Sequence, residues 1–206
     1  MIIESLARLK IIPVIVINDI KNAVPLAQAL VDGGLPCAEI TFRTAAAAGA
    51  IREITKAFPS MLVGAGTVLT AQQADEAVAA GAKFVVAPGL NPTTVKYCTE
   101  KGIPILPGVC TPSEIEQGLS LGLDVLKFFP AEQAGGVDML RALCSPYANV
   151  KFVPTGGLTP ANVSQYLALK NVLACGGSWM VKEEMISAGE FDGIRELTSE
   201  AVRAVC

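Results

Sequence analysis

The sequence of 206 residues contains no histidine, and this absence excludes several kinds of active site. Without an imidazole, the chain has neither a Ser-His-Asp nor a Cys-His nucleophile, and no histidine can bind a metal. Any acid–base chemistry must therefore use carboxylates, lysine, tyrosine or thiols.

Charged residues are also scarce, at 17% of the chain compared with about 25% in an average globular protein. Hydrophobic residues make up 51%, so the chain is not disordered. The mean hydropathy of +0.49 favours a large interior, a subunit interface or both. The net charge is −3 and no basic stripe is visible, so we expect no binding to nucleic acid.

Long apolar segments are missing too, because the strongest run, 11–17, has only seven residues and contains Pro13. A membrane span needs about 20 such residues, so we expect neither membrane association nor a signal peptide. No two cysteines lie closer than twelve positions, which leaves no CxxC motif. We expect all six to be reduced small hydrophobes in a cytoplasmic protein: Cys37, Cys98, Cys110, Cys144, Cys175 and Cys206.

One pattern repeats along the chain: a short apolar run, a polar or Gly/Pro turn, and then a helical stretch. Apolar runs of this length that do not alternate are typical of strands buried on both faces of a parallel sheet. The eight runs cover residues 12–17, 38–42, 62–67, 84–88, 104–109, 125–130, 152–155 and 172–178. We therefore predict an α/β fold, a closed parallel (β/α)8 TIM barrel, as a single domain over residues 1–206.

Helix signals between the runs agree with this prediction. Thr111-Pro112-Ser113-Glu114 has the spacing of a capping box with proline at the first helical position, and Thr159-Pro160 repeats the cap and proline. Gly81, Gly102 and Gly122 lie where helices should end in a left-handed residue. In barrels of this kind, active sites lie at the C-terminal ends of the strands.

Lys127 is the most informative residue, because it interrupts the apolar run Val125–Pro130. Strand alternation places Val125, Lys127 and Phe129 on one face. Apolar surroundings disfavour the charged form of an amine, and a neutral amine can attack a ketone to form a Schiff base. The alternative is a structural lysine that pairs with a carboxylate in the core.

Glu39 interrupts an earlier apolar run in the same way, and Thr41 and Arg43 share its parity. A carboxylate held near a lysine can transfer protons, although a plain ion pair would also explain Glu39. The forked guanidinium of Arg43 suits a substrate carboxylate or phosphate, with a helix-capping salt bridge as the alternative.

Two glycine-rich turns end the seventh and eighth runs, namely Pro154-Thr155-Gly156-Gly157 and Cys175-Gly176-Gly177-Ser178. Barrels often bind phosphate between these two loops, where glycine lets the backbone approach an anion closely. Small residues near Thr67 and Pro88 would keep the mouth of the barrel open. The alternative is that they serve only to permit tight turns from strand to helix.

Taken together, the sequence resembles the 2-keto-3-deoxy-6-phosphogluconate (KDPG) aldolase family, whose members often also cleave 4-hydroxy-2-oxoglutarate. The stretches that carry the resemblance run from the second apolar run to the eighth, and only their combination is specific. They are Glu39-Ile40-Thr41-Phe42-Arg43-Thr44, Val63-Gly64-Ala65-Gly66-Thr67-Val68, Pro88-Gly89, Lys127-Phe128-Phe129-Pro130-Ala131-Glu132, Pro154-Thr155-Gly156-Gly157 and Gly176-Gly177-Ser178-Trp179.

The resemblance implies a class I aldolase that needs no metal and no other cofactor. Lys127 would form an imine with the C2 ketone of a phosphorylated keto acid, and Glu39 would transfer protons. Arg43 and Thr67 would hold the pyruvyl carboxylate, and Pro88 would line the pocket. The residues expected to hold the phosphate are Thr155, Gly156, Gly157, Gly177 and Ser178.

The resemblance further implies a homotrimer and the last step of the Entner–Doudoroff route, which yields pyruvate and glyceraldehyde 3-phosphate. Some family members carry an arginine for phosphate at the end of the first strand, where this chain has Val14-Ile15-Val16-Ile17-Asn18. Several alternatives stay open: an aldolase for the C4-epimeric galactonate substrate, a sugar-phosphate isomerase or epimerase, and a non-catalytic barrel that binds sugar phosphates.

Overall fold

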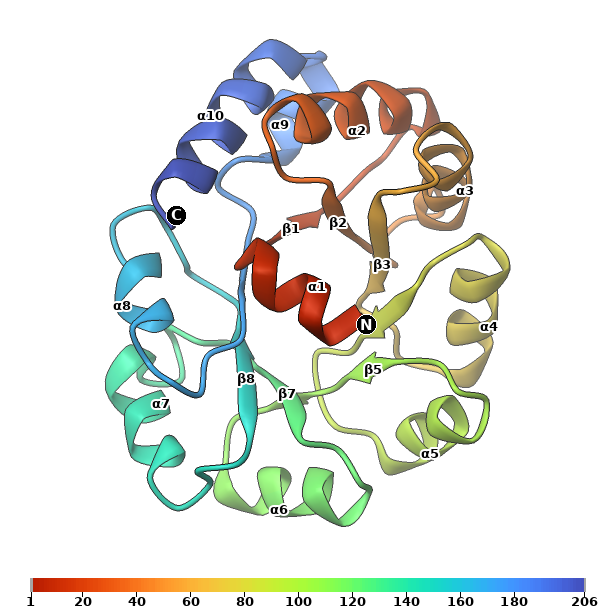
Figure 1. Cartoon of the computed structure of the whole chain (residues 1–206). Coiled ribbons are helices and arrows are strands. Elements are labelled where there is room, and N and C mark those ends of the chain that lie inside the picture. The colour runs from red at the N-terminus through yellow and green to blue at the C-terminus, as the bar shows by residue number, and fades with distance from the viewer. Residues whose placement is uncertain (1, 206) are drawn as a thin grey trace.

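The computed structural model describes residues 2–205, in which short parallel strands alternate with helices around a ring (Figure 1). Every apolar run of the sequence overlaps a strand, and the run 104–109 contains two. The strands are β1 (Ile11–Ile15), β2 (Cys37–Thr41), β3 (Leu62–Gly66), β4 (Phe84–Val86), β5 (Ile105–Leu106), β6 (Gly108–Val109), β7 (Val125–Phe128), β8 (Lys151–Pro154) and β9 (Cys175–Gly177).

The helices form the outer layer, except that α1 lies across the centre of the ring (Figure 1). Leu6 of α1 is fully buried there against residues of the strands, so α1 covers the ring at the N-terminal ends of the strands. The helices are α1 (Ile2–Leu9), η1 (Ile20–Asn22), α2 (Ala23–Asp32), α3 (Ala47–Ala57), α4 (Ala71–Ala79), α5 (Pro92–Glu100), α6 (Pro112–Ser120), α7 (Gly136–Cys144), α8 (Val163–Leu167), α9 (Glu183–Ala188) and α10 (Phe191–Arg203).

The prediction of a closed eight-stranded TIM barrel is wrong, because the strands form two separate sheets. One is an open, six-stranded parallel half-barrel in the order β5-β4-β3-β2-β1-β9, and the other contains β6-β7-β8. Pro107 separates β5 from β6 because proline has no N–H to donate to a ladder. On the other side, β8 ends at Pro154 and meets the last segment of the ring only through the isolated bridges Phe152–Val172 and Thr155–Gly176.

The core has an inner part within the ring and an outer part between strands and helices. Strand β7 shows how alternate residues divide between the two, because successive side chains point to opposite faces. Val125 packs in the inner cluster with Leu6 and Phe84, whereas Leu126 and Phe128 pack in an outer cluster. Lys127 shares the parity of Val125, so its side chain belongs to the inner side, as the sequence predicts.

Most of the predicted helix signals are confirmed. Thr111 and Glu114 form a reciprocal capping box at the start of α6, with Pro112 in the first turn. Gly81, Gly102 and Gly122 follow α4, α5 and α6 with positive φ. The prediction at Thr159-Pro160 is wrong, because α8 begins later, at Val163, and Asn162 accepts a hydrogen bond from the Thr159 N–H.

The five cysteines among residues 2–205 are all free, and Cys206 lies outside the described residues. Burial raises the pKa of the Cys37 and Cys175 thiols far above their usual range, so neither thiol ionises at neutral pH. Within residues 2–205, no helix combines the length and the apolar character that crossing a bilayer requires.

Gly108, the residue after Pro107, packs closely against the backbone of another segment of the chain. A Cβ added to Gly108 would lie 2.1 Å from the carbonyl oxygen of Pro88, a backbone atom that cannot move independently. We expect Gly108→Ala to lower the free energy of unfolding by about 3 kcal/mol, measured by urea denaturation. Gly89→Ala is the matched control, because a Cβ there meets nothing within 4 Å. Equal stability of the two variants would contradict the prediction.

Candidate active site

The centre of the candidate site is a buried pair formed by Lys127 and Glu39. Lys127 belongs to β7 and Glu39 to β2, which lie in different sheets on opposite sides of the ring (Figure 1). Lys127 is 5% exposed and Glu39 is 2% exposed. The Nζ atom of Lys127 lies 3.7 Å from Oε1 of Glu39. The structure therefore brings together the two charged residues that interrupt apolar strands in the sequence.

Glycine on the neighbouring strand makes room for this carboxylate. A Cβ on Gly66 of β3 would lie 2.3 Å from Glu39 Oε1, a distance that real atoms do not tolerate. The other member of the pair, Lys127, is covered by the Phe129 ring. Its Nζ atom lies 4.8 Å from the ring centroid. Gly66 and Phe129 thus hold the pair in a closely packed space.

One oxygen of the pair lacks a hydrogen-bond donor. Glu39 Oε1 is buried and has no hydrogen-bond partner among residues 2–205, and its 3.7 Å separation from Lys127 Nζ is too long for a hydrogen bond. A buried acceptor without a donor is rare in proteins and calls for an explanation. A bound water or a substrate hydroxyl would supply the missing donor.

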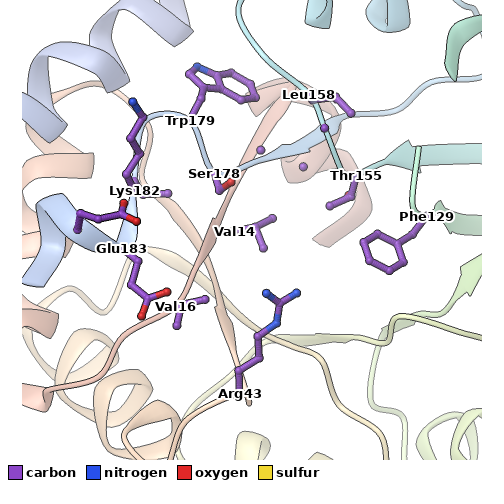
Figure 2. Close-up of a pocket in the computed structure, with 16 residues that line it drawn as sticks. Val14, Val16, Arg43, Phe129, Thr155, Leu158, Ser178, Trp179, Lys182 and Glu183 are labelled. Carbon is purple, nitrogen blue, oxygen red and sulfur yellow. The ribbon is translucent and has the colours of Figure 1, made fainter. Parts of the chain in front are cut away.

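Next to this pair lies a cavity of about 440 Å³ at the C-terminal ends of β1, β8 and β9 (Figure 2). Six of the predicted site residues line it: Arg43, Thr155, Gly156, Gly157, Gly177 and Ser178. In Figure 2, the guanidinium of Arg43 points into the same space that Thr155, Ser178 and Phe129 border. Arg43 is exposed and has no ion pair among residues 2–205, so the predicted alternative of a helix-capping salt bridge is not seen.

The loop after β8 needs its glycines for conformational reasons. Gly156 and Gly157 have φ values of 106° and 77°, in the left-handed region that side chains disfavour. The segment after β7 is attached to this loop, because the N–H groups of Ala131 and Glu132 donate to the carbonyls of Thr155 and Gly156. The strand that carries Lys127 therefore continues directly into contact with the glycine loop.

Gly176 and Gly177, the last two residues of β9, need to be glycine because other groups approach them closely. A Cβ on Gly176 would lie 2.3 Å from Thr155 Oγ1, and one on Gly177 would lie 1.8 Å from the Trp179 ring. The contact of Gly176 with Thr155 brings the two glycine-rich segments together at one edge of the cavity. Their backbone N–H groups and the Ser178 hydroxyl can bind an anion there.

Four predicted site residues do not line the cavity: Lys127, Glu39, Thr67 and Pro88. Phe129 connects the two parts of the site, because it lines the cavity and its ring centroid lies 4.8 Å from Lys127 Nζ. Thr67 is half-buried and has a φ of 56°, which is unusual for a β-branched residue and marks a strained position beside Gly66. Pro88 lines a separate, mostly apolar cavity of about 380 Å³.

The sequence reasoning missed other residues that line the main cavity. They are Val14, Val16, Phe129, Leu158, Trp179, Val181, Lys182, Glu183 and Glu184. The segment after Ser178 follows a predicted strand end, which is the one signal that could have identified Lys182 and Glu183. Within residues 2–205, no three His, Cys, Asp or Glu side chains gather closely enough to hold a metal ion.

A buried primary amine beside a buried carboxylate, next to a cavity with glycine-rich loops, is typical of an enzyme that forms an imine with a carbonyl substrate. Comparisons with known proteins agree with this class. A family model described as KDPG and KHG aldolase matches residues 2–197. The 2-dehydro-3-deoxy-phosphogluconate aldolase of Treponema pallidum is 50% identical over 204 residues, which cover 99% of this chain and 97% of that protein.

Two similar solved structures are also KDPG aldolases. The one from Legionella pneumophila, with pyruvate captured as a covalent carbinolamine intermediate, has a TM-score of 0.93 and 42% identity over 97% of both chains. The one from Zymomonas mobilis, with 3-phosphoglycerate, has a TM-score of 0.90 and 42% identity over 99% of this chain and 98% of that chain. The chain belongs to the KDPG and KHG aldolase family, whose members cleave carbon–carbon bonds.

The contact between Gly66 and Glu39 gives a test of the site geometry. Parallel pairing with Thr41 of β2 fixes the position of Gly66, so in Gly66→Ala the Glu39 carboxylate must turn away. We expect a crystal structure of this variant to show more than 3.7 Å between Lys127 Nζ and Glu39 Oε1. We also expect the free energy of unfolding to fall by about 1–3 kcal/mol.

A double variant separates this clash from other effects of the substitution. If Glu39 is the group that resists the added methyl, Glu39→Ala with Gly66→Ala should be no less stable than Glu39→Ala alone. A further loss of stability in the double variant would show that the methyl group clashes elsewhere.

Proposed function

We propose that this protein is a class I, metal-independent aldolase that cleaves 2-dehydro-3-deoxy-6-phosphogluconate into pyruvate and glyceraldehyde 3-phosphate. The observation that carries the proposal is the buried Lys127–Glu39 pair at 3.7 Å beside a cavity of about 440 Å³ that Arg43 and both glycine-rich segments line. Membership of the family and the named activity of relatives at about 50% identity support the same reaction.

In the proposed mechanism, Glu39 takes a proton from the Lys127 amine, and the free Nζ attacks the C2 carbonyl of the substrate to form a carbinolamine. Glu39 returns this proton to the C2 hydroxyl, which leaves as water and gives a protonated imine that acts as an electron sink. The unpartnered Oε1 of Glu39 provides the base for proton transfer, directly or through one water. A relative holding pyruvate as a covalent carbinolamine supports the first step.

Bond cleavage follows from the imine. Glu39 accepts the proton of the C4 hydroxyl as the C3–C4 bond breaks, and the electrons of that bond move into the imine to form an enamine. The aldehyde leaves, C3 regains a proton from Glu39, and water hydrolyses the resulting imine to release pyruvate and free Lys127. No external oxidant, reductant or metal enters this sequence of steps.

The remaining predicted residues bind the two ends of the substrate in this proposal. Arg43 and Thr67 hold the pyruvyl carboxylate. Pro88 borders the separate cavity of about 380 Å³, so we assign it no direct contact with the ends of the substrate. The phosphate lies between the two glycine loops, on Thr155, Gly156, Gly157, Gly177 and Ser178. The shared cavity of Arg43 and both loops supports this division, as does the 3-phosphoglycerate in the Zymomonas mobilis relative.

Cleavage of 4-hydroxy-2-oxoglutarate to pyruvate and glyoxylate is a second proposed activity. The family description includes KHG, and the same lysine chemistry applies because the substrate also has a C2 ketone and a C4 hydroxyl. This substrate ends in a carboxylate instead of a phosphate. The two substrates would therefore differ only in their contacts with the distal part of the cavity.

For the whole chain we propose one catalytic domain in a cytoplasmic homotrimer. Five large apolar side chains at the surface could be covered by neighbouring subunits: Ile20, Val24, Leu69, Val78 and Leu119. The high mean hydropathy supports the assembly, and the free cysteines among residues 2–205 suit a reducing compartment. We propose no nucleic-acid or membrane partner.

The imine mechanism predicts a covalent adduct at one residue. When the protein is incubated with pyruvate and borohydride, mass spectrometry should find a reduced pyruvyl adduct on Lys127. Lys127→Met should lose the adduct, and its rate of pyruvate release should fall to background. Its binding of sugar phosphate should persist because the glycine loops are untouched.

Lys151→Met is the matched control for this experiment. Lys151 lies on the adjacent strand β8, but its Nζ donates to the carbonyl of Lys170 at the N-terminal end of the strand. We expect this variant to keep full activity and the adduct. An adduct on another lysine, or a wild-type protein that binds sugar phosphates without turnover, would refute the mechanism.

The phosphate position predicts a selective loss of binding in Ser178→Ala. Removing one hydroxyl donor to a charged group should raise KM for the phosphorylated substrate about tenfold, with kcat almost unchanged. KM for 4-hydroxy-2-oxoglutarate should change less, because its carboxylate carries less charge. Ser187→Ala, on the exposed surface of α9, is the control in steady-state assays. Equal effects on both substrates would contradict the assignment.

A further inference from the structure

Three charged residues at the cavity have no role in the mechanism above, namely Lys182, Glu183 and Glu184. Glu183, the first residue of α9, lines the cavity in the same segment as the glycine loop after β9. Figure 2 shows its carboxylate beside Val16, whereas Lys182 extends in the opposite direction. A carboxylate is unexpected at a cavity that must bind a phosphate, because like charges repel.

Hydrogen bonds from the segment after β1 hold this carboxylate in place. The Nδ2 atom of Asn18 donates to Glu183 Oε1 at 2.7 Å. A second amide, Asn22 Nδ2, donates to the carbonyl of Ile186 at 3.0 Å and holds the same helix. The two contacts attach α9 to the segment after β1 and place the exposed Glu183 carboxylate at the cavity.

The negative charge of Glu183 is not neutralised by these contacts. An asparagine amide is uncharged, and Glu183 has no ion pair among residues 2–205. Its carboxylate therefore repels any anion in this part of the cavity. The repulsion grows with the charge of the ligand, and a phosphate ester carries about −1.5 to −2 at pH 7 whereas a carboxylate carries −1.

We propose that Glu183, held by Asn18, is a specificity-determining residue that weakens binding of phosphate-terminated substrates more than carboxylate-terminated ones. Asn18 acts as a positioning residue, because it fixes where the charge lies. The chain thereby shifts its selectivity toward unphosphorylated keto acids such as 4-hydroxy-2-oxoglutarate. This proposal rests on the proposed function for the identity of the two substrates.

The test compares Glu183→Gln with wild type on both substrates. Glutamine keeps the size of the side chain and an oxygen that accepts from Asn18, and it removes only the charge. KM for 2-dehydro-3-deoxy-6-phosphogluconate should fall about three- to tenfold at low ionic strength, with kcat unchanged. KM for 4-hydroxy-2-oxoglutarate should fall by a smaller factor. High salt should reduce the difference between variant and wild type, because salt screens exposed charges.

Glu190→Gln is the matched control, since Glu190 is exposed, lies just beyond α9 and does not line the cavity. It removes the same charge from the protein and should leave both KM values unchanged. An equal fall of KM for both substrates, a rise of KM in Glu183→Gln, or an effect of equal size in Glu190→Gln would overturn the proposal.

A binding experiment separates this proposal from the proposed function. Titration of inorganic phosphate into wild type and Glu183→Gln by calorimetry needs no turnover. We expect a lower Kd for phosphate in the variant, and an unchanged Kd would overturn the selectivity role. If wild type cleaves neither substrate, the proposed function fails, and the calorimetric result still decides whether Glu183 repels phosphate.

Discussion

The structure depends on keeping an amine and a carboxylate together inside an apolar ring. Removing two charges from water is costly, and their mutual attraction offsets this cost only when they lie close together. At 3.7 Å, Lys127 and Glu39 are near enough to compensate each other, yet too far apart to satisfy the carboxylate oxygen. The pair can therefore be accommodated in the fold while Glu39 Oε1 still lacks a hydrogen-bond donor. Such an oxygen suits a site that must bind a reacting molecule.

Close backbone approach is the second constraint on the site. Gly66 makes space for Glu39, and Gly176 and Gly177 make space for Thr155 and Trp179. Side chains at these positions would push apart groups that the proposed chemistry needs side by side. These glycines look like ordinary turn residues in the sequence. Their main role is to lack a Cβ atom, which leaves space for the neighbouring side chains.

The sequence predicts most of the fold, because local patterns determine it. Eight apolar runs give the strands, and the capping box at Thr111 and Glu114 gives the start of α6. Closure of the ring was predicted wrongly, because it depends on hydrogen bonds between segments far apart in the chain. Pro107 lies within an apolar run, and the missing N–H breaks the ladder only once its neighbours are in place.

The sequence by itself determined that chemistry without histidine must use lysine and carboxylate, and it singled out Lys127 and Glu39 because charge in an apolar strand is costly. Only the tertiary structure decided that these two residues meet across the ring and that Phe129, which contacts Lys127, also lines the cavity. It also placed Glu183 at that cavity, through a contact with Asn18 across 165 positions. No sequence pattern encodes such a contact, because it exists only after β1 and α9 have packed together.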